Sequence, residues 1–160
     1  MNPLAKLTLA AVIAALALPA AAPAKVLHFK GKATGVAAAP HMTITFDVTS
    51  SRGRATRIAN VYVTSADYHC QMNGRFERNV RFFDAGAVSR SGKFEIRETQ
   101  LPPGYDNWLY GTVILPKTKN GKRSPLRVKG FLSSEFGFGL KRGEYNCLAA
   151  DHFTAMRVGA

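Results

Sequence analysis

The chain has 160 residues, of which 22 are Lys or Arg and 10 are Asp or Glu, and its formal charge at pH 7 is +12. This length suits one domain with a sizeable buried core and argues against a multidomain protein. The excess of positive charge favours solubility and weak association with polyanions, but it does not bear on the fold.

The first 24 residues are typical of a secretory signal peptide. Lys6 follows a charged amino terminus, residues 7–18 are apolar, and Ala22-Pro23-Ala24 has the small-x-small pattern of a cleavage site. As a helix, the apolar stretch would rise only about 18 Å, which is too short for the ~30 Å core of a bilayer. We therefore predict cleavage after Ala24, with an uncleaved anchor as the alternative. Residues 25–160 then form one exported domain of charge +11, without a transmembrane segment, in the periplasm, on the cell surface or outside the cell.

After residue 25 the sequence is typical of short strands separated by turns. Residues 41–50 alternate apolar and polar side chains, which indicates a strand with one buried face. A turn at residues 50–54 leads to a second strand at 57–65, rich in β-branched and aromatic residues. Further candidate strands lie at residues 26–35, 80–83, 93–98, 108–115, 126–132, 136–143 and 152–158. No window keeps a helical period, so we predict an all-β fold, an antiparallel β-sandwich or partly closed barrel of about 8–10 strands.

One hairpin can be assigned a register from its turn. Asn120-Gly121 is a favoured two-residue turn because both positions tolerate positive φ. Pairing outward from this turn sorts the apolar residues onto one face, which supports the register independently. Pro116 and Pro125 would face each other, so we expect pairing to fail there. The opposed pairs are Leu115 with Leu126, Val113 with Val128, Gly111 with Gly130, Leu109 with Leu132, Ile114 with Arg127, Thr112 with Lys129, and Tyr110 with Phe131.

The longest irregular stretch is expected at residues 99–108, where two prolines and a glycine oppose regular pairing. An exposed Tyr105 or Trp108 in this stretch would be available to contact a ligand. The competing interpretation is that both rings close the end of the core.

Cys70 and Cys147 are the only cysteines. Two cysteines in a small exported domain usually form a disulfide, because thiols outside the cytosol are oxidised. A zinc site with His69 and His152 fits less well, since structural zinc ligands come in closely spaced pairs and adjacent strand residues point to opposite faces. A cysteine nucleophile with one of these histidines as its base is the third alternative. We predict the disulfide.

No sequence motif of an enzyme is present, whether a nucleophile elbow, a zinc-protease helix, a Walker loop or a dinucleotide fingerprint. The 10 carboxylates include no close pair typical of glycosidases, although such pairs can assemble in three dimensions. Asp151 and His152 follow Cys147 closely, but a histidine beside a disulfide more often packs than reacts. We therefore predict no catalytic residue, no metal ligand and no cofactor.

Residues 117–129 contain six cations and no acid, which makes them candidate contacts for a polyanion. In the hairpin register Lys119 opposes Lys122, an unfavourable pair unless solvent or an anion screens it. Candidate partners are an acidic cell-wall polymer, an anionic lipid headgroup or an acidic glycan; the lack of interleaved aromatic residues disfavours nucleic acid. The alternative is a solvated surface with no ligand. The six cations are Lys117, Lys119, Lys122, Arg123, Arg127 and Lys129.

Three short motifs form a recognisable series: Phe29-Lys30-Gly31 in the first strand, Gly92-Lys93-Phe94 later, and Phe153-Thr154-Ala155 shortly after Cys147. In these motifs the chain resembles a family of small exported bacterial all-β domains without an assigned function. The resemblance implies a β-sandwich tied by one disulfide and carries over no catalytic residue. That family more often has Trp where Phe153 stands, and residues 148–152 replace its small-Gly pair, so we expect the final turn to differ.

Two functional hypotheses follow. The first is a non-catalytic exported module that binds at the cell envelope or in the medium, partly through its cationic surface. Within this class the runner-up is a protein–protein module, such as an inhibitor or a subunit of an exported complex. The second hypothesis is a hydrolase that acts on an envelope polymer, with a site assembled from loops such as residues 99–108.

Overall fold

The structure is a computed structural model that describes residues 23–34, 41–71, 74–100, 104–119, 122–123, 125–138 and 145–159. Nearly all of the predicted signal peptide, up to residue 22, lies outside this part of the chain. All regular structure in the described residues is β-strand, which confirms the predicted all-β fold. These residues contain no helix of the length and apolar character that a membrane span requires.

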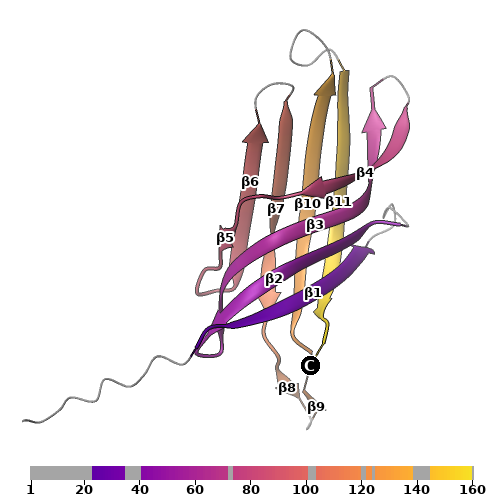
Figure 1. The fold of residues 1–160 in the computed structure, drawn as a ribbon. Helices are drawn as coiled ribbons and strands as arrows, with labels where there is room; N and C mark the ends of the chain where they lie inside the picture. The colour runs from indigo at the N-terminus through magenta and orange to yellow at the C-terminus, as the bar shows by residue number, and fades with distance from the viewer. Residues whose placement is uncertain are drawn as a thin grey trace, which may run out of the picture.

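The described residues form eleven strands. Nine belong to one antiparallel sheet in the order β4-β3-β2-β1-β11-β10-β7-β6, with β5 beside β3, while β8 and β9 form a separate hairpin. In Figure 1, β1, β2 and β3 cross obliquely over one face of β6, β7, β10 and β11, so the sheet folds over itself into two layers. The strands are β1 (Lys25–Thr34), β2 (Thr43–Ser51), β3 (Arg54–Cys70), β4 (Arg75–Arg81), β5 (Gly86–Ala87), β6 (Lys93–Gln100), β7 (Tyr105–Ile114), β8 (Thr118–Lys119), β9 (Lys122–Arg123), β10 (Arg127–Phe138) and β11 (Tyr145–Arg157).

Two closed circuits of strands give the sheet its shape. β11 pairs with β1 and, at its start, also with β3, so that β1, β2, β3 and β11 close a ring of four strands. The other layer is closed by β5, which pairs with β3, and by a bridge between Val88 and Phe94 that reaches β6. The fold therefore combines the two predicted architectures, because a folded sheet also closes into a small barrel.

β3 belongs to both circuits because it is long and irregular. It has 17 residues, and its pairing register shifts twice opposite β2 and once opposite β4. Asn60 and Ser65 lie at two of these shifts with φ values of 54° and 52°, in the left-handed region that few residues other than glycine adopt. Such bulges bend a strand and increase its twist, which lets β3 pass from one layer to the other.

The disulfide between Cys70 and Cys147 is present as predicted, and it lies where β3 meets β11. The two cysteines are directly opposite each other in the register, and Leu148 opposite His69 is the second pair of this seam. Since both cysteines are in this bond, the zinc and nucleophile alternatives are excluded for them. The bond is compatible with an oxidising compartment.

The β7–β10 hairpin has the register predicted from its turn, from Arg127 opposite Ile114 to Leu132 opposite Leu109. The predicted pair of Leu115 with Leu126 is not in the ladder, and Leu115 is exposed rather than buried. β7 ends and β10 begins one pair earlier than predicted, close to Pro116 and Pro125, where pairing was expected to fail. The turn at residues 120–121 itself lies outside the described residues.

Some strand limits were predicted wrongly. Residues 99–108 are not one irregular loop, because β6 continues to Gln100 and β7 begins at Tyr105. The segments at 126–132 and 136–143 were expected as separate strands, yet β10 runs unbroken from Arg127 to Phe138. The physical reason is that β7 pairs with β6 on one side and with β10 on the other. This pairing keeps the polar residues at the start of β7 in the sheet.

The core lies between the two layers. The inward residues of β2 alternate as predicted, and Ile44, Phe46 and Val48 are almost completely buried. Phe46 stacks on Phe29 with ring centroids 5.5 Å apart and meets Phe153 edge-on at 6.2 Å. These contacts join β1, β2 and β11 in the core, on the opposite side of β6, β7, β10 and β11 from their outer face.

Candidate functional site

Four aromatic side chains form a continuous row across the outer face of β7, β10 and β11. Trp108 and Tyr110 lie on β7, Phe131 on β10 and His152 on β11. Successive ring centroids are 4.8, 5.4 and 4.9 Å apart. Trp108 and Tyr110 are 39% and 38% exposed, respectively, although they are large rings on a regular sheet. We call these four side chains the aromatic row.

The strand register produces the aromatic row. Tyr110 lies directly opposite Phe131, and Phe131 lies directly opposite His152. A single cross-strand aromatic pair stabilises a sheet by about 0.2–1 kcal/mol, so one such pair is explained by its contribution to stability alone. Scattered exposed apolar residues also need no explanation, whereas a contiguous exposed patch often marks a binding surface.

A second row, of alternating Lys and Thr, runs parallel to the first on the same face. Three exposed lysines, Lys93, Lys129 and Lys32, are separated in this row by Thr112 and Thr154, each residue lying opposite the next. In the described part of the chain, none of these three lysines has an acidic partner within 4.0 Å. We call this the lysine row.

The aromatic row and most of the lysine row line a shallow open groove of about 940 Å³; Lys32, at the end of the lysine row, is not among its lining residues. Its lining combines ring faces with hydroxyl, ammonium and carboxylate groups, the last from Glu95 on β6. The groove crosses several strands, and the core residues Phe94 and Phe153 are among its lining residues. Such a shape suits an extended chain better than a compact ligand, because small-molecule sites are usually deep and enclosed.

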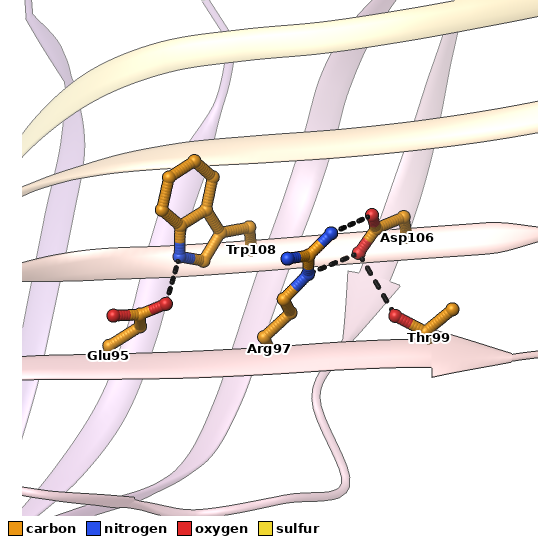
Figure 2. Close-up of polar contacts among 5 residues, drawn as sticks. All are labelled: Glu95, Arg97, Thr99, Asp106 and Trp108. Carbon is orange, nitrogen blue, oxygen red and sulfur yellow. Dashed lines mark hydrogen bonds and ion pairs between the residues drawn. The ribbon is translucent and has the colours of Figure 1, made fainter.

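Polar contacts fix the end of the aromatic row nearest β6 (Figure 2). The indole N–H of Trp108 donates to Glu95 Oε1 at 2.9 Å. Beside it, Arg97 donates to both oxygens of Asp106, at 2.8 and 3.3 Å, and Thr99 donates to the same carboxylate at 3.4 Å. The hydrogen bond to Asp106 raises the pKa of Arg97 above its ordinary value. Because the indole N–H is already bonded, the ring face of Trp108 is what remains for a ligand.

Another polar cluster lies inside the sandwich, between β3, β4, β7 and β10. Ser134 donates to Asn107 Oδ1 at 2.5 Å, and the hydroxyl of Tyr68 lies 2.5 Å from Ser134 Oγ. Arg78 donates to the hydroxyl of Tyr105 at 3.0 Å. Burial raises the pKa of Tyr68, so its phenol stays protonated near neutral pH. These groups bond to one another, which is the pattern of a structural network rather than of a reactive site.

The two aromatic residues predicted as ligand contacts have different surroundings. Trp108 belongs to the exposed aromatic row. Tyr105 faces inward, where it stacks on Phe136 at 4.7 Å and lies under the Arg78 guanidinium at 4.8 Å. Tyr105 therefore closes the end of the core, while Trp108 does not.

The six predicted cations are not gathered in one described patch. Lys129 lies in the lysine row, and Arg127 lies two residues before it with a buried Nε that has no hydrogen-bond partner. Lys117 is exposed just beyond β7. Lys119 pairs with Lys122 across the β8–β9 hairpin as predicted, but the side chains of Lys119, Lys122 and Arg123 lie outside the described part of the chain.

Sequence reasoning did not identify Tyr110 or Phe131 as site residues, and it considered His152 only as a zinc ligand or a catalytic base. The available signal was the hairpin register, which already placed Tyr110 opposite Phe131 on the face that does not join the core. Asp151 and His152, which looked like a local pair, point to opposite faces of β11, with Asp151 buried. Among the described residues, no three His, Cys, Asp or Glu side chains gather in a way that would hold a metal ion.

No family model, curated protein or solved structure matches the chain. The functional inference therefore rests on the chemistry of the aromatic row and the lysine row.

Proposed function

We propose that the protein is a non-catalytic exported module that binds an acidic polysaccharide of the cell envelope or the medium. The ligand lies across the outer face of β6, β7, β10 and β11. The observation that supports this is the parallel course of the aromatic row and the lysine row along one open groove.

The aromatic row supplies the apolar part of recognition. A sugar ring has an apolar face of C–H groups and a rim of hydroxyls, so it packs on an exposed aromatic ring while the rim remains free to form hydrogen bonds. Trp108 and Tyr110 offer ring faces at a small entropic cost, because their side chains have few rotatable bonds. Glu95, Thr112 and Thr154 lie beside these rings as hydrogen-bonding groups.

The lysine row supplies the preference for an anionic chain. Each exposed ammonium contributes little alone, because water and salt screen it. Three lysines in one row contact successive acidic groups of the same polymer, so their contributions combine as in any multivalent contact. The formal charge of +11 on residues 25–160 adds a long-range attraction for polyanions.

Export belongs to the same proposal. A signal peptide ending at Ala24 would send the domain across the membrane, and the Cys70–Cys147 disulfide fits an oxidising compartment. The sequence also resembles a family of small exported bacterial domains, and membership in that family is part of the proposal.

The proposal is tested by calorimetric titration of the mature protein with polygalacturonate, using dextran as the neutral polymer. We expect binding to polygalacturonate that weakens as salt rises from ~50 to ~200 mM, and no binding to dextran. Trp108→Ala and Lys129→Glu should each weaken binding about tenfold. The matched control is Arg57→Glu, an equal charge change on β3 in the other layer, which should bind like the wild type.

Three results would contradict the proposal. Equal losses in Arg57→Glu and Lys129→Glu would mean that only overall charge matters. Unchanged binding in Trp108→Ala would remove the aromatic row from the site. Release of reducing ends from the polymer would favour the hydrolase instead.

A protein partner is the second candidate, because a contiguous exposed apolar row also suits a protein interface. Such a module would form a defined complex in light scattering, with little dependence on salt. It would lose that complex in Trp108→Ala but keep it in Lys129→Glu.

A further inference from the structure

An apolar hollow of about 530 Å³ opens at the end of the sandwich nearest the β8–β9 hairpin, which is the lower end in Figure 1. Leu27 and Val48 line it from one layer, and Val113, Leu115 and Leu126 line it from the other. Val48 and Val113 are almost fully buried, so the floor of the hollow is the core itself. The disulfide seam is at the opposite end of β11.

The hollow exists because the β7–β10 ladder stops short of this end. Pro116 and Pro125 both line the hollow, and a proline has no N–H to donate to a ladder. Leu115 is consequently outside the ladder and 49% exposed at the rim. Water in contact with this lining is unfavourable, and an apolar occupant would remove that cost.

A second hollow, of about 360 Å³, adjoins the first and is cationic. Its lining includes Arg52, Arg54 and Arg90, and it shares Val113 and Leu115 with the apolar hollow. No carboxylate among the described residues lines either hollow, and none of these arginines has an acidic partner within 4.0 Å in that part of the chain. An apolar cavity therefore continues directly into an uncompensated cluster of guanidinium groups.

The turn between β2 and β3 gives independent support. Arg52 has a φ of 50° and Gly53 a φ of 73°. A two-residue hairpin turn with both φ values positive prefers Asn or Asp before Gly, and Arg in that position is strained. Strained backbone positions concentrate at functional sites, and here the strained residue places a guanidinium beside the hollow.

We propose that this end of the sandwich binds one molecule of an anionic amphiphile, with a single alkyl or acyl chain in the apolar hollow and its acidic head against the arginines. The apolar hollow has the volume of an ordinary small-molecule site. Guanidinium groups bind oxyanions through paired hydrogen bonds, which gives the head its preferred charge. This site is on a different surface from the polysaccharide groove and does not depend on it.

The experiment is calorimetric titration of the mature protein with alkyl sulfates below their critical micelle concentrations. Decyl sulfate should bind at one site, and affinity should fall about fourfold for each methylene removed from the chain. Decyltrimethylammonium has the same chain with a cationic head and should bind at least tenfold more weakly. Methyl sulfate, which has the head without the chain, should not compete.

Two variants assign the binding to this end. Leu115→Asn places an amide at the exposed rim and should weaken decyl sulfate at least tenfold. The double variant Arg54→Gln, Arg90→Gln should reduce the preference for sulfate over trimethylammonium. Arg57→Gln, on β3 outside both hollows, is the matched control, and near-UV circular dichroism checks that every variant keeps the native fold.

Equal affinity for the two decyl compounds would overturn the anionic head, and competition by methyl sulfate would overturn the chain. Wild-type affinity in Leu115→Asn would overturn the location, and no binding of decyl sulfate would overturn the site. Trp108→Ala should leave alkyl sulfate binding unchanged, and Leu115→Asn should leave polygalacturonate binding unchanged. Failure of one proposal is thereby distinguished from failure of the other.

Discussion

Replacing both Cys70 and Cys147 by alanine should lower the free energy of unfolding by about 4.5 kcal/mol at 25 °C. The cysteines are 77 positions apart, and the chain-entropy relation converts a loop of this length into that value. Alanine is the suitable replacement because Cys147 is 1% exposed, and serine would bury a hydroxyl there. Such a loss is a large part of the 5–15 kcal/mol typical of a domain.

Apart from the disulfide, few contacts hold β3 and β11 together at this seam. β3 and β11 share only two register pairs in the described residues, and Gln71 N–H donates to the Asn146 carbonyl at 3.1 Å beside them. Each such hydrogen bond contributes about 1 kcal/mol net, which is too little to hold the seam closed without the disulfide. Because the chain-entropy account places the effect of the bond in the unfolded chain, we expect most of that value to be observed.

The measurement is urea unfolding followed by circular dichroism and Trp108 fluorescence, with linear extrapolation to water. The m-value of the double variant should rise, because an unfolded chain without the cross-link is less compact. Reduced wild-type protein is the control and should unfold like the variant. A loss below about 1 kcal/mol would refute the entropic account, because the unfolded chain would then have gained little entropy on release of the cross-link.

Three further predictions concern packing and pH. Gly130→Ala should cost roughly 1–3 kcal/mol, because an added Cβ would lie 2.6 Å from the ring of Phe153 and 2.5 Å from a backbone oxygen; an unchanged urea midpoint would contradict this packing. Arg75→Gln should slightly reduce stability above pH ~4 only, because the hydrogen bond from Arg75 lowers the pKa of Asp67 and its contribution is lost as pH falls; parallel stability curves down to pH ~2 would disprove this. Tyr68→Phe should cost about 1 kcal/mol near neutral pH. Burial raises the pKa of Tyr68 above 10.0, so the wild type alone loses this contribution as pH rises past that value, and the difference from the variant should narrow in alkaline urea titrations.

Features that depend on neighbouring residues, such as the register of a hairpin, could be predicted from the sequence. The Asn120-Gly121 turn was sufficient to derive every pair from Leu109 opposite Leu132 to Ile114 opposite Arg127, because a two-residue turn leaves one register and that register also buries the leucines and valines. The same register placed Tyr110 opposite Phe131 on the outer face. The predicted register therefore already placed two of the four residues of the aromatic row, Tyr110 and Phe131, beside each other.

Contacts between distant segments were not predictable in the same way. His152 joins the row because β11 pairs with β10, and Lys32 joins the lysine row because β1 pairs with β11. No turn connects β1 to β11, so no local signal sets their register. Asp106 and Asn107 fall within the stretch predicted as irregular from its prolines and glycine, yet cross-strand partners hold both of them in β7. Arg97 bonds Asp106, and Ser134 bonds Asn107.

The bends of β3 at Asn60 and Ser65 have a consequence for cooperativity. Because β3 belongs to both circuits of strands, we expect that neither layer unfolds while the other remains native. Hydrogen exchange in β1 and β2 should therefore require the same global opening as exchange in β7 and β10. A partly unfolded form with one intact layer, which is a common starting point for aggregation, should not accumulate.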